Sequence, residues 1–155
     1  MEYITIEPNT EGHWLARDDD VDPLTLVGPE GHNRITLRRD FSSAGWVNDM
    51  GHVRPEDFPR NVFGSCVLVA LGAAVRPYAG TVVITGWDLT AEREVVDLDT
   101  ERIENVCEAV RLALGIDPDP DGAIHPSQWA RDIRAFAEKV PTMPAPTMRF
   151  VGGTL

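Results

Sequence analysis

The spacing of apolar residues changes along this chain of 155 residues, and the change limits the folds that the chain can adopt. Between Arg34 and Arg38, apolar and polar residues alternate, as they do in a strand with one exposed face. Over residues 103–114 and 129–140, apolar residues instead recur every three or four positions. That period gives a helix one apolar stripe, so both helices can cover a sheet. The sequence therefore predicts an α+β fold.

Short apolar segments between clusters of proline, glycine, asparagine and aspartate predict the strands. The first four have the spacing of an N-terminal β-meander, and two later ones flank the polar turn 88–93 as a central hairpin. Residues 65–75 are apolar on all sides, which indicates a buried helix with Ser65 as N-cap, although a central strand has the same pattern. We predict one domain over residues 1–140, with a mostly antiparallel sheet covered by about three helices. The predicted strands are 3–6, 13–16, 24–27, 34–37, 81–87 and 94–98.

The formal net charge of −11 at pH 7 bears on the partners that this chain can have. Nucleic acids and anionic membranes are disfavoured as partners, because both are bound through Lys and Arg side chains. A basic protein partner, cation binding and a merely solvated acidic surface are all compatible with the charge. The acidic run 18–22 lacks a turn glycine, and we predict a solvated loop there.

The N-terminal segment does not have the pattern of an export signal. Glu2 stands where a signal peptide would carry positive charge, and no apolar h-region follows. The longest apolar run, residues 66–75, is about half of the roughly 20 residues that cross a bilayer. We therefore expect a cytoplasmic protein, or a virion protein if a phage encodes it. Cys66 and Cys107 lie within apolar segments, which favours buried thiols over a disulfide.

Residues 117–128, between the two striped helices, carry aspartates at alternate positions followed by Gly122. The segment resembles an EF-hand calcium loop, in which such aspartates converge on one ion and the glycine allows a sharp turn. Gln128 stands where that family has a bidentate glutamate, so the resemblance implies a weak site with one charge fewer. The same composition is also typical of an ordinary turn between helices. The implied ligands are Asp117, Asp119, Asp121, Ala123 through its carbonyl, and Gln128.

Gly64-Ser65-Cys66, at the head of the apolar segment, resembles the nucleophile of papain-like cysteine hydrolases. The resemblance implies Cys66 as nucleophile, with His52 or His125 as its base. The glutamine that the family has upstream is absent, and Val67 replaces the aromatic residue after the cysteine. The alternative is a buried structural thiol.

Two segments are candidates for contact with a partner. Aromatic and methionine side chains in the stretch 40–60 either pin a loop onto the core or form a contact surface, and scattered aromatic residues usually pack. Prolines after Val140 end the last helix and predict an extended tail over residues 141–155, whose apolar side chains suit docking on a neighbour. The predicted interaction residues are Trp46, Met50, Phe58, Met148 and Phe150.

Gly45-Trp46, residues 66–74 and the helix that begins near Trp129 together resemble small uncharacterised domains of actinobacteria and their phages. The charge, the contact segments and the missing nucleotide and metalloprotease motifs favour a non-enzymatic, acidic protein-interaction module. Such a module would act as a phage assembly component or as an inhibitor of a host protein, through a protein partner or self-association. We expect no cofactor other than calcium. The alternatives are a calcium-binding domain that uses residues 117–128 and a cysteine hydrolase that uses Cys66.

Overall fold

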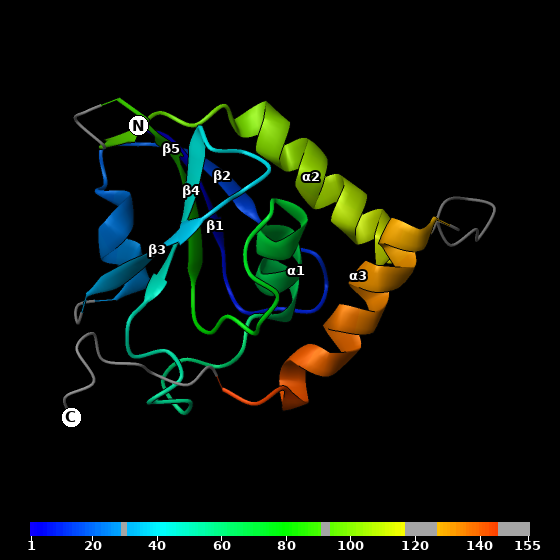
Figure 1. The fold of residues 1–155 in the computed structure, drawn as a ribbon. Helices are drawn as coiled ribbons and strands as arrows, with labels where there is room; N and C mark the ends of the chain where they lie inside the picture. Colours follow the sequence, from blue (N-terminus) through cyan, green and yellow to red (C-terminus); the bar gives the residue numbers. More distant parts are fainter. Residues whose placement is uncertain (29–30, 91–93, 117–126, 146–155) are drawn as a thin grey trace.

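Two hairpins joined by a later strand form the sheet (Figure 1). A computed structural model describes residues 1–28, 31–90, 94–116 and 127–145. In these residues the strand order is β2-β1-β5-β4-β3, a sixth strand pairs with β5, and every pairing is antiparallel. The strands are β1 (Glu2–Ile6), β2 (Leu15–Asp18), β3 (His32–Thr36), β4 (Ser43–Asn48), β5 (Val82–Trp87) and β6 (Val95–Val96).

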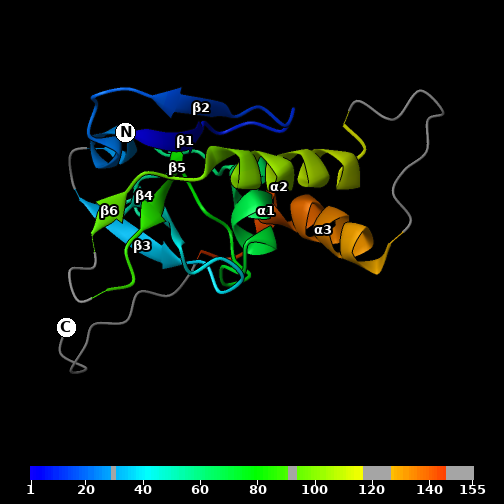
Figure 2. The ribbon, with the colours of Figure 1, turned by 90° about the horizontal axis from the view of Figure 1, so that it is seen from above.

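The α-helices lie together on one side of the sheet, and a short 3-10 helix lies on the other (Figures 1 and 2). The predicted α+β class, with an antiparallel sheet and three α-helices, is confirmed for the described residues. No helix in that part of the chain combines the length and the apolar character needed to cross a membrane. The helices are α1 (Val62–Ala70), α2 (Thr100–Ala113) and α3 (Gln128–Lys139), with 3-10 helices η1 (Pro23–Val27) and η2 (Val140–Thr142).

Side chains alternate between two hydrophobic clusters, one on each face of the sheet. Ile4 and Ile84 are register partners that face the α-helices, where they join Phe63 and Cys107 in the larger cluster. The smaller cluster, on the face toward η1, contains Tyr3, Val27, Ala44, Trp46 and Val83. The sheet is therefore buried on both faces near its centre.

Asn61 joins the start of α1 to the ends of two strands. Its side chain is fully buried, and its Oδ1 accepts the Gly64 N–H at 2.8 Å as the N-cap of α1. Its Nδ2 donates to the carbonyl oxygens of Ile6 (2.7 Å) and Gly80 (3.0 Å). The predicted N-cap, Ser65, instead lies inside α1, where its Oγ accepts the Tyr78 N–H at 2.9 Å.

The structure corrects three of the predicted elements. The buried helix expected over residues 65–75 is α1, which spans Val62–Ala70 and so begins and ends earlier. Residues 24–27 form most of η1 rather than a strand, because Pro23 fixes a helical φ and the Asp22 carboxylate caps the Leu24 N–H at 3.1 Å. Within the expected loop 40–60, Ser43–Asn48 forms β4, all of which is buried. Burial on both faces removes the alternation that marks a half-exposed strand.

The order of the strands differs from a continuous N-terminal meander in one respect. β5 lies between β1 and β4, so the first four strands form two separate hairpins. The predicted pairing of β5 with the following strand is confirmed, and β6 is reduced to two residues, opposite Gly86 and Trp87.

Candidate functional site

A groove with a volume of about 560 Å³ opens between the N-terminus, η1 and β6. We call it the acidic groove, because four of the nine described residues that line it carry carboxylates and the other five are apolar. The apolar residues are Met1, Val21, Pro23, Leu24 and Val95. The carboxylates are Asp19, Asp20, Asp22 and Glu94.

Two of the four carboxylates hold the loop that forms the groove. Asp19 accepts the Tyr3 hydroxyl at 2.8 Å and the Val21 N–H at 3.1 Å, and it forms an ion pair with Arg17 at 3.0 Å. Desolvation opposes the charged form, but these hydrogen bonds and the charge of Arg17 outweigh it and lower the pKa of the Asp19 carboxyl. Asp22 caps η1. The acidic run is therefore an ordered loop, in which these two aspartates have structural partners.

The other two carboxylates, Asp20 and Glu94, are exposed. Among the described residues their side chains form no hydrogen bond and no ion pair. The nearest positive charge on the lining is the N-terminal ammonium, which donates to the Asp19 carbonyl oxygen at 2.7 Å and lies 3.5 Å from an Asp18 carboxylate oxygen. Within the described part of the chain, the groove consequently presents carboxylates without an ion-pair partner beside apolar surface.

Apolar surface is also accessible in the groove. Met1 and Val21 are each 39% exposed, and Leu24 and Val95 are partly buried. An apolar lining beside exposed carboxylates matches a side chain with an aliphatic stem and a cationic head, the chemistry of lysine and arginine. The site thus has the composition of a binding surface for a basic segment.

The three predicted interaction residues in the stretch 40–60 lie in different environments. Trp46 is only 6% exposed, and its Nε1 donates to the Thr85 hydroxyl at 2.9 Å. Its ring makes an edge contact with Trp87, with the centroids 5.8 Å apart. Met50 and Phe58 are half-buried, and the Arg54 guanidinium lies over the Phe58 ring. Trp46 therefore stabilises the smaller hydrophobic cluster.

The calcium-loop resemblance falls almost wholly outside the described residues, as do Met148 and Phe150. Asp117, Asp119, Asp121 and Ala123 cannot be placed, so calcium binding stays a prediction. Gln128 begins α3 directly after its N-cap Ser127, and its amide Nε2 donates to Asp132 at 2.9 Å. In the part of the chain that the structure describes, no three His, Cys, Asp or Glu side chains are grouped so that they could hold a metal ion.

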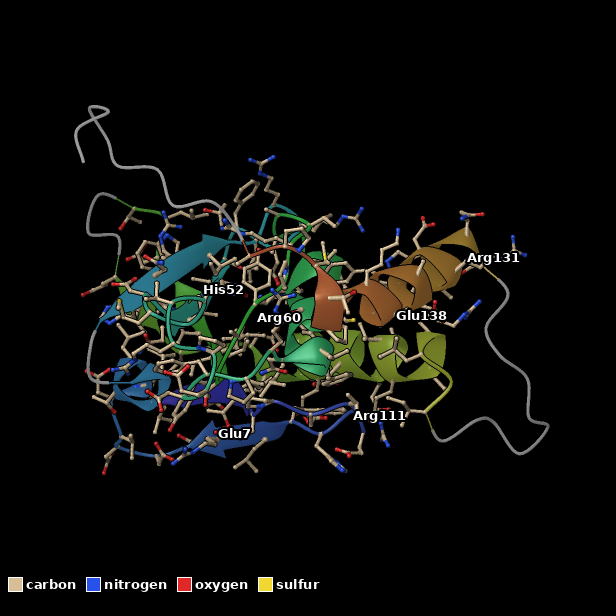
Figure 3. The ribbon with its side chains drawn as sticks, turned by 90° about the horizontal axis from the view of Figure 1, so that it is seen from below. Glu7, His52, Arg60, Arg111, Arg131 and Glu138 are labelled. Carbon is tan, nitrogen blue, oxygen red and sulfur yellow. The ribbon has the colours of Figure 1, made fainter. Side chains whose placement is uncertain are left out.

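Cys66 is fully buried in α1, an environment that does not favour a nucleophile. Burial raises the pKa of its thiol to about 12, so the reactive thiolate is scarce at neutral pH. The Nε2 of His52 is hydrogen-bonded to the Pro77 carbonyl oxygen at 3.0 Å, and His125 lies outside the described residues. Figure 3 labels His52 and Arg60, which lie on the same side of the molecule. The Arg60 guanidinium has its own partner, because it donates to the Val140 carbonyl oxygen at 2.7 Å.

We expect both cysteines to resist alkylation in the folded protein. Burial raises the pKa of the Cys107 thiol to about 12 as well, and neither side chain is exposed. Labelling by iodoacetamide at pH 7.5 should be slower by a factor on the order of 100 in buffer than in urea, because reaction requires the core to open. A Cys107→Ala variant isolates the rate at Cys66. Rapid native labelling of that variant would support the hydrolase hypothesis.

Comparison of the chain with protein-family models, with curated proteins and with solved structures finds no match. The prediction for residues 18–22 was a solvated loop. That prediction included neither the exposed apolar side chain of Val21 nor the capping of η1 by Asp22. It also had no signal that β6 would bring Glu94 and Val95 to the same place from far along the chain.

Proposed function

We propose that this chain is a protein-interaction module that binds a basic segment of a partner protein in the acidic groove. The observation that supports the proposal is the combination of accessible apolar side chains with the exposed carboxylates of Asp20 and Glu94. Both roles considered from the sequence, an assembly component and an inhibitor of a host protein, require such a surface.

The two kinds of lining residue contribute differently to binding. The net charge of −11 attracts a cationic partner over a distance and accelerates its association. Once bound, a lysine or arginine places its stem on Val21 and Leu24, while its charged head meets the exposed carboxylates. Affinity then comes mainly from the apolar contact, and selection against acidic partners comes from the charge.

A pair of synthetic peptides tests this proposal. A fluorescent peptide of alternating arginine and leucine should bind the wild-type protein, and one of alternating glutamate and leucine should not. Replacing both Asp20 and Glu94 by lysine should raise the dissociation constant of the basic peptide by about tenfold or more, because attraction becomes repulsion. Fluorescence anisotropy measures both constants.

A matched variant separates the groove from the overall charge. Glu56 and Glu138 are exposed and do not line the acidic groove, so replacing both by lysine changes the net charge equally. We expect the basic peptide to bind this control within about twofold of wild type at 150 mM salt, where distant charges are screened. Equal losses in the two double variants would show that only long-range charge matters and would refute the groove as the site.

A further inference from the structure

A second hollow lies between α1 and α3. Both helices lie on the side of the sheet away from η1 (Figure 1). We call it the helical groove. Its volume is about 220 Å³, and α1 and α3 provide most of its lining. Six of the eight lining residues are apolar, namely Val69, Ala70, Val75, Trp129, Ile133 and Phe136.

The lining of the helical groove includes one strongly exposed apolar side chain. Val75 is 68% exposed, the largest exposed fraction among the exposed large hydrophobic residues described. The helical side chains beside it, Val69 and Trp129, are only partly buried. One patch therefore combines a largely exposed apolar side chain with a hollow whose other apolar lining residues are more buried. A surface with both features is suited to packing against itself.

The charges in this patch are also self-complementary. The two charged lining residues are Arg39 and Asp132, so their formal charges cancel within a chain of net charge −11. Arg39 is exposed and makes no ion pair with any other described residue. Asp132 is exposed and accepts one hydrogen bond, from Gln128. Contact between two identical faces therefore adds no net like charge at the groove, and salt screens the longer-range repulsion between two chains of net charge −11.

From these observations we propose that the helical groove is the interface of a symmetric homodimer. A two-fold axis makes every contact reciprocal, so Val75 of each copy enters the groove of the other. The same axis pairs Arg39 of each copy with the partner's Asp132, giving two identical ion pairs. This interface uses a surface separate from the acidic groove, and its test is independent of the proposed function.

A charge-swap experiment tests the dimer in the full chain. Sedimentation velocity should show a dimer for the wild type at about 50 μM, a concentration well above the Kd of a stable homodimer. Arg39→Asp and Asp132→Arg should each weaken dimerisation by about tenfold or more, because each creates two like-charge contacts. An equimolar mixture of the two variants should recover the dimer, since both pairs are then opposite in charge.

Two further variants distinguish the interface from a general effect of charge. Val75→Asp should be monomeric alone and in any mixture, because it places a carboxylate in the apolar hollow. Arg38→Asp changes the neighbouring exposed arginine, which does not line the groove, and should leave the dimer intact. The altered side chains are exposed or partly so, and circular dichroism should confirm that each variant folds. A monomeric wild type overturns the proposal, and so does a mixture that fails to recover the dimer.

Discussion

Replacing Asn61 by alanine should lower the free energy of unfolding by about 4 kcal/mol, a large part of the roughly 5–15 kcal/mol available to a domain. The buried amide serves three backbone groups at once, and alanine serves none of them. The Ile6 and Gly80 carbonyl oxygens would lose a buried donor, and the Gly64 N–H would lose the cap of α1. Urea unfolding followed by tryptophan fluorescence measures the change.

Two controls define the source of that loss. Asn61→Asp keeps an oxygen for the Gly64 N–H but cannot donate to the two carbonyl groups at neutral pH, so it should destabilise at least as much as alanine. Asn105→Ala removes an exposed asparagine from α2 and should change the unfolding free energy by no more than about 0.5 kcal/mol. An Asn61→Ala protein as stable as wild type would show that the three hydrogen bonds contribute little.

Trp46→Ala should likewise destabilise the protein by about 4 kcal/mol, through the cavity left by a buried indole. Trp46→Phe keeps an aromatic ring but removes the donor to the Thr85 hydroxyl, and about 1–2 kcal/mol should be lost. Thermal or urea unfolding of the three proteins gives the comparison. The expected order of stability is wild type, phenylalanine variant, alanine variant.

Phe41 supplies a matched control for this series, because it precedes β4 and is 54% exposed. Phe41→Ala should cost less than about 1 kcal/mol, since little of its ring leaves a packed environment. If Trp46→Ala unfolded like wild type but lost binding of the basic peptide, the original prediction of Trp46 as an interaction residue would hold instead.

The elements that the sequence predicted best are those that bury only one of their faces. α2 and α3 each bury one stripe, and the expected helices over residues 103–114 and 129–140 match them closely. β4 was missed because all of its residues are buried, which leaves no alternation to detect. η1 was mistaken for a strand because four residues with two leucines and a valine fit either structure, and the local capping by Asp22 decided the outcome.

The candidate site was less predictable than the fold, because it depends on contacts between distant segments. The carboxylates of residues 18–22 are evident in the sequence, but their division into paired and unpaired groups depends on Tyr3 and Arg17. Glu94 joins them only because β6 pairs with β5. The helical groove similarly requires α1 and α3 to pack together, which the two apolar stripes alone do not specify.

The position of β5 has a consequence for how the chain folds as it is synthesised. The hairpins β1–β2 and β3–β4 have local contacts and can form early, but β5, the strand that unites them, is complete only once residue 87 has been synthesised. Until then, β1 and β4 each have one edge with unpaired backbone groups. During this interval a nascent chain can pair with another molecule instead of with its own β5, so slow synthesis or crowding favours aggregation.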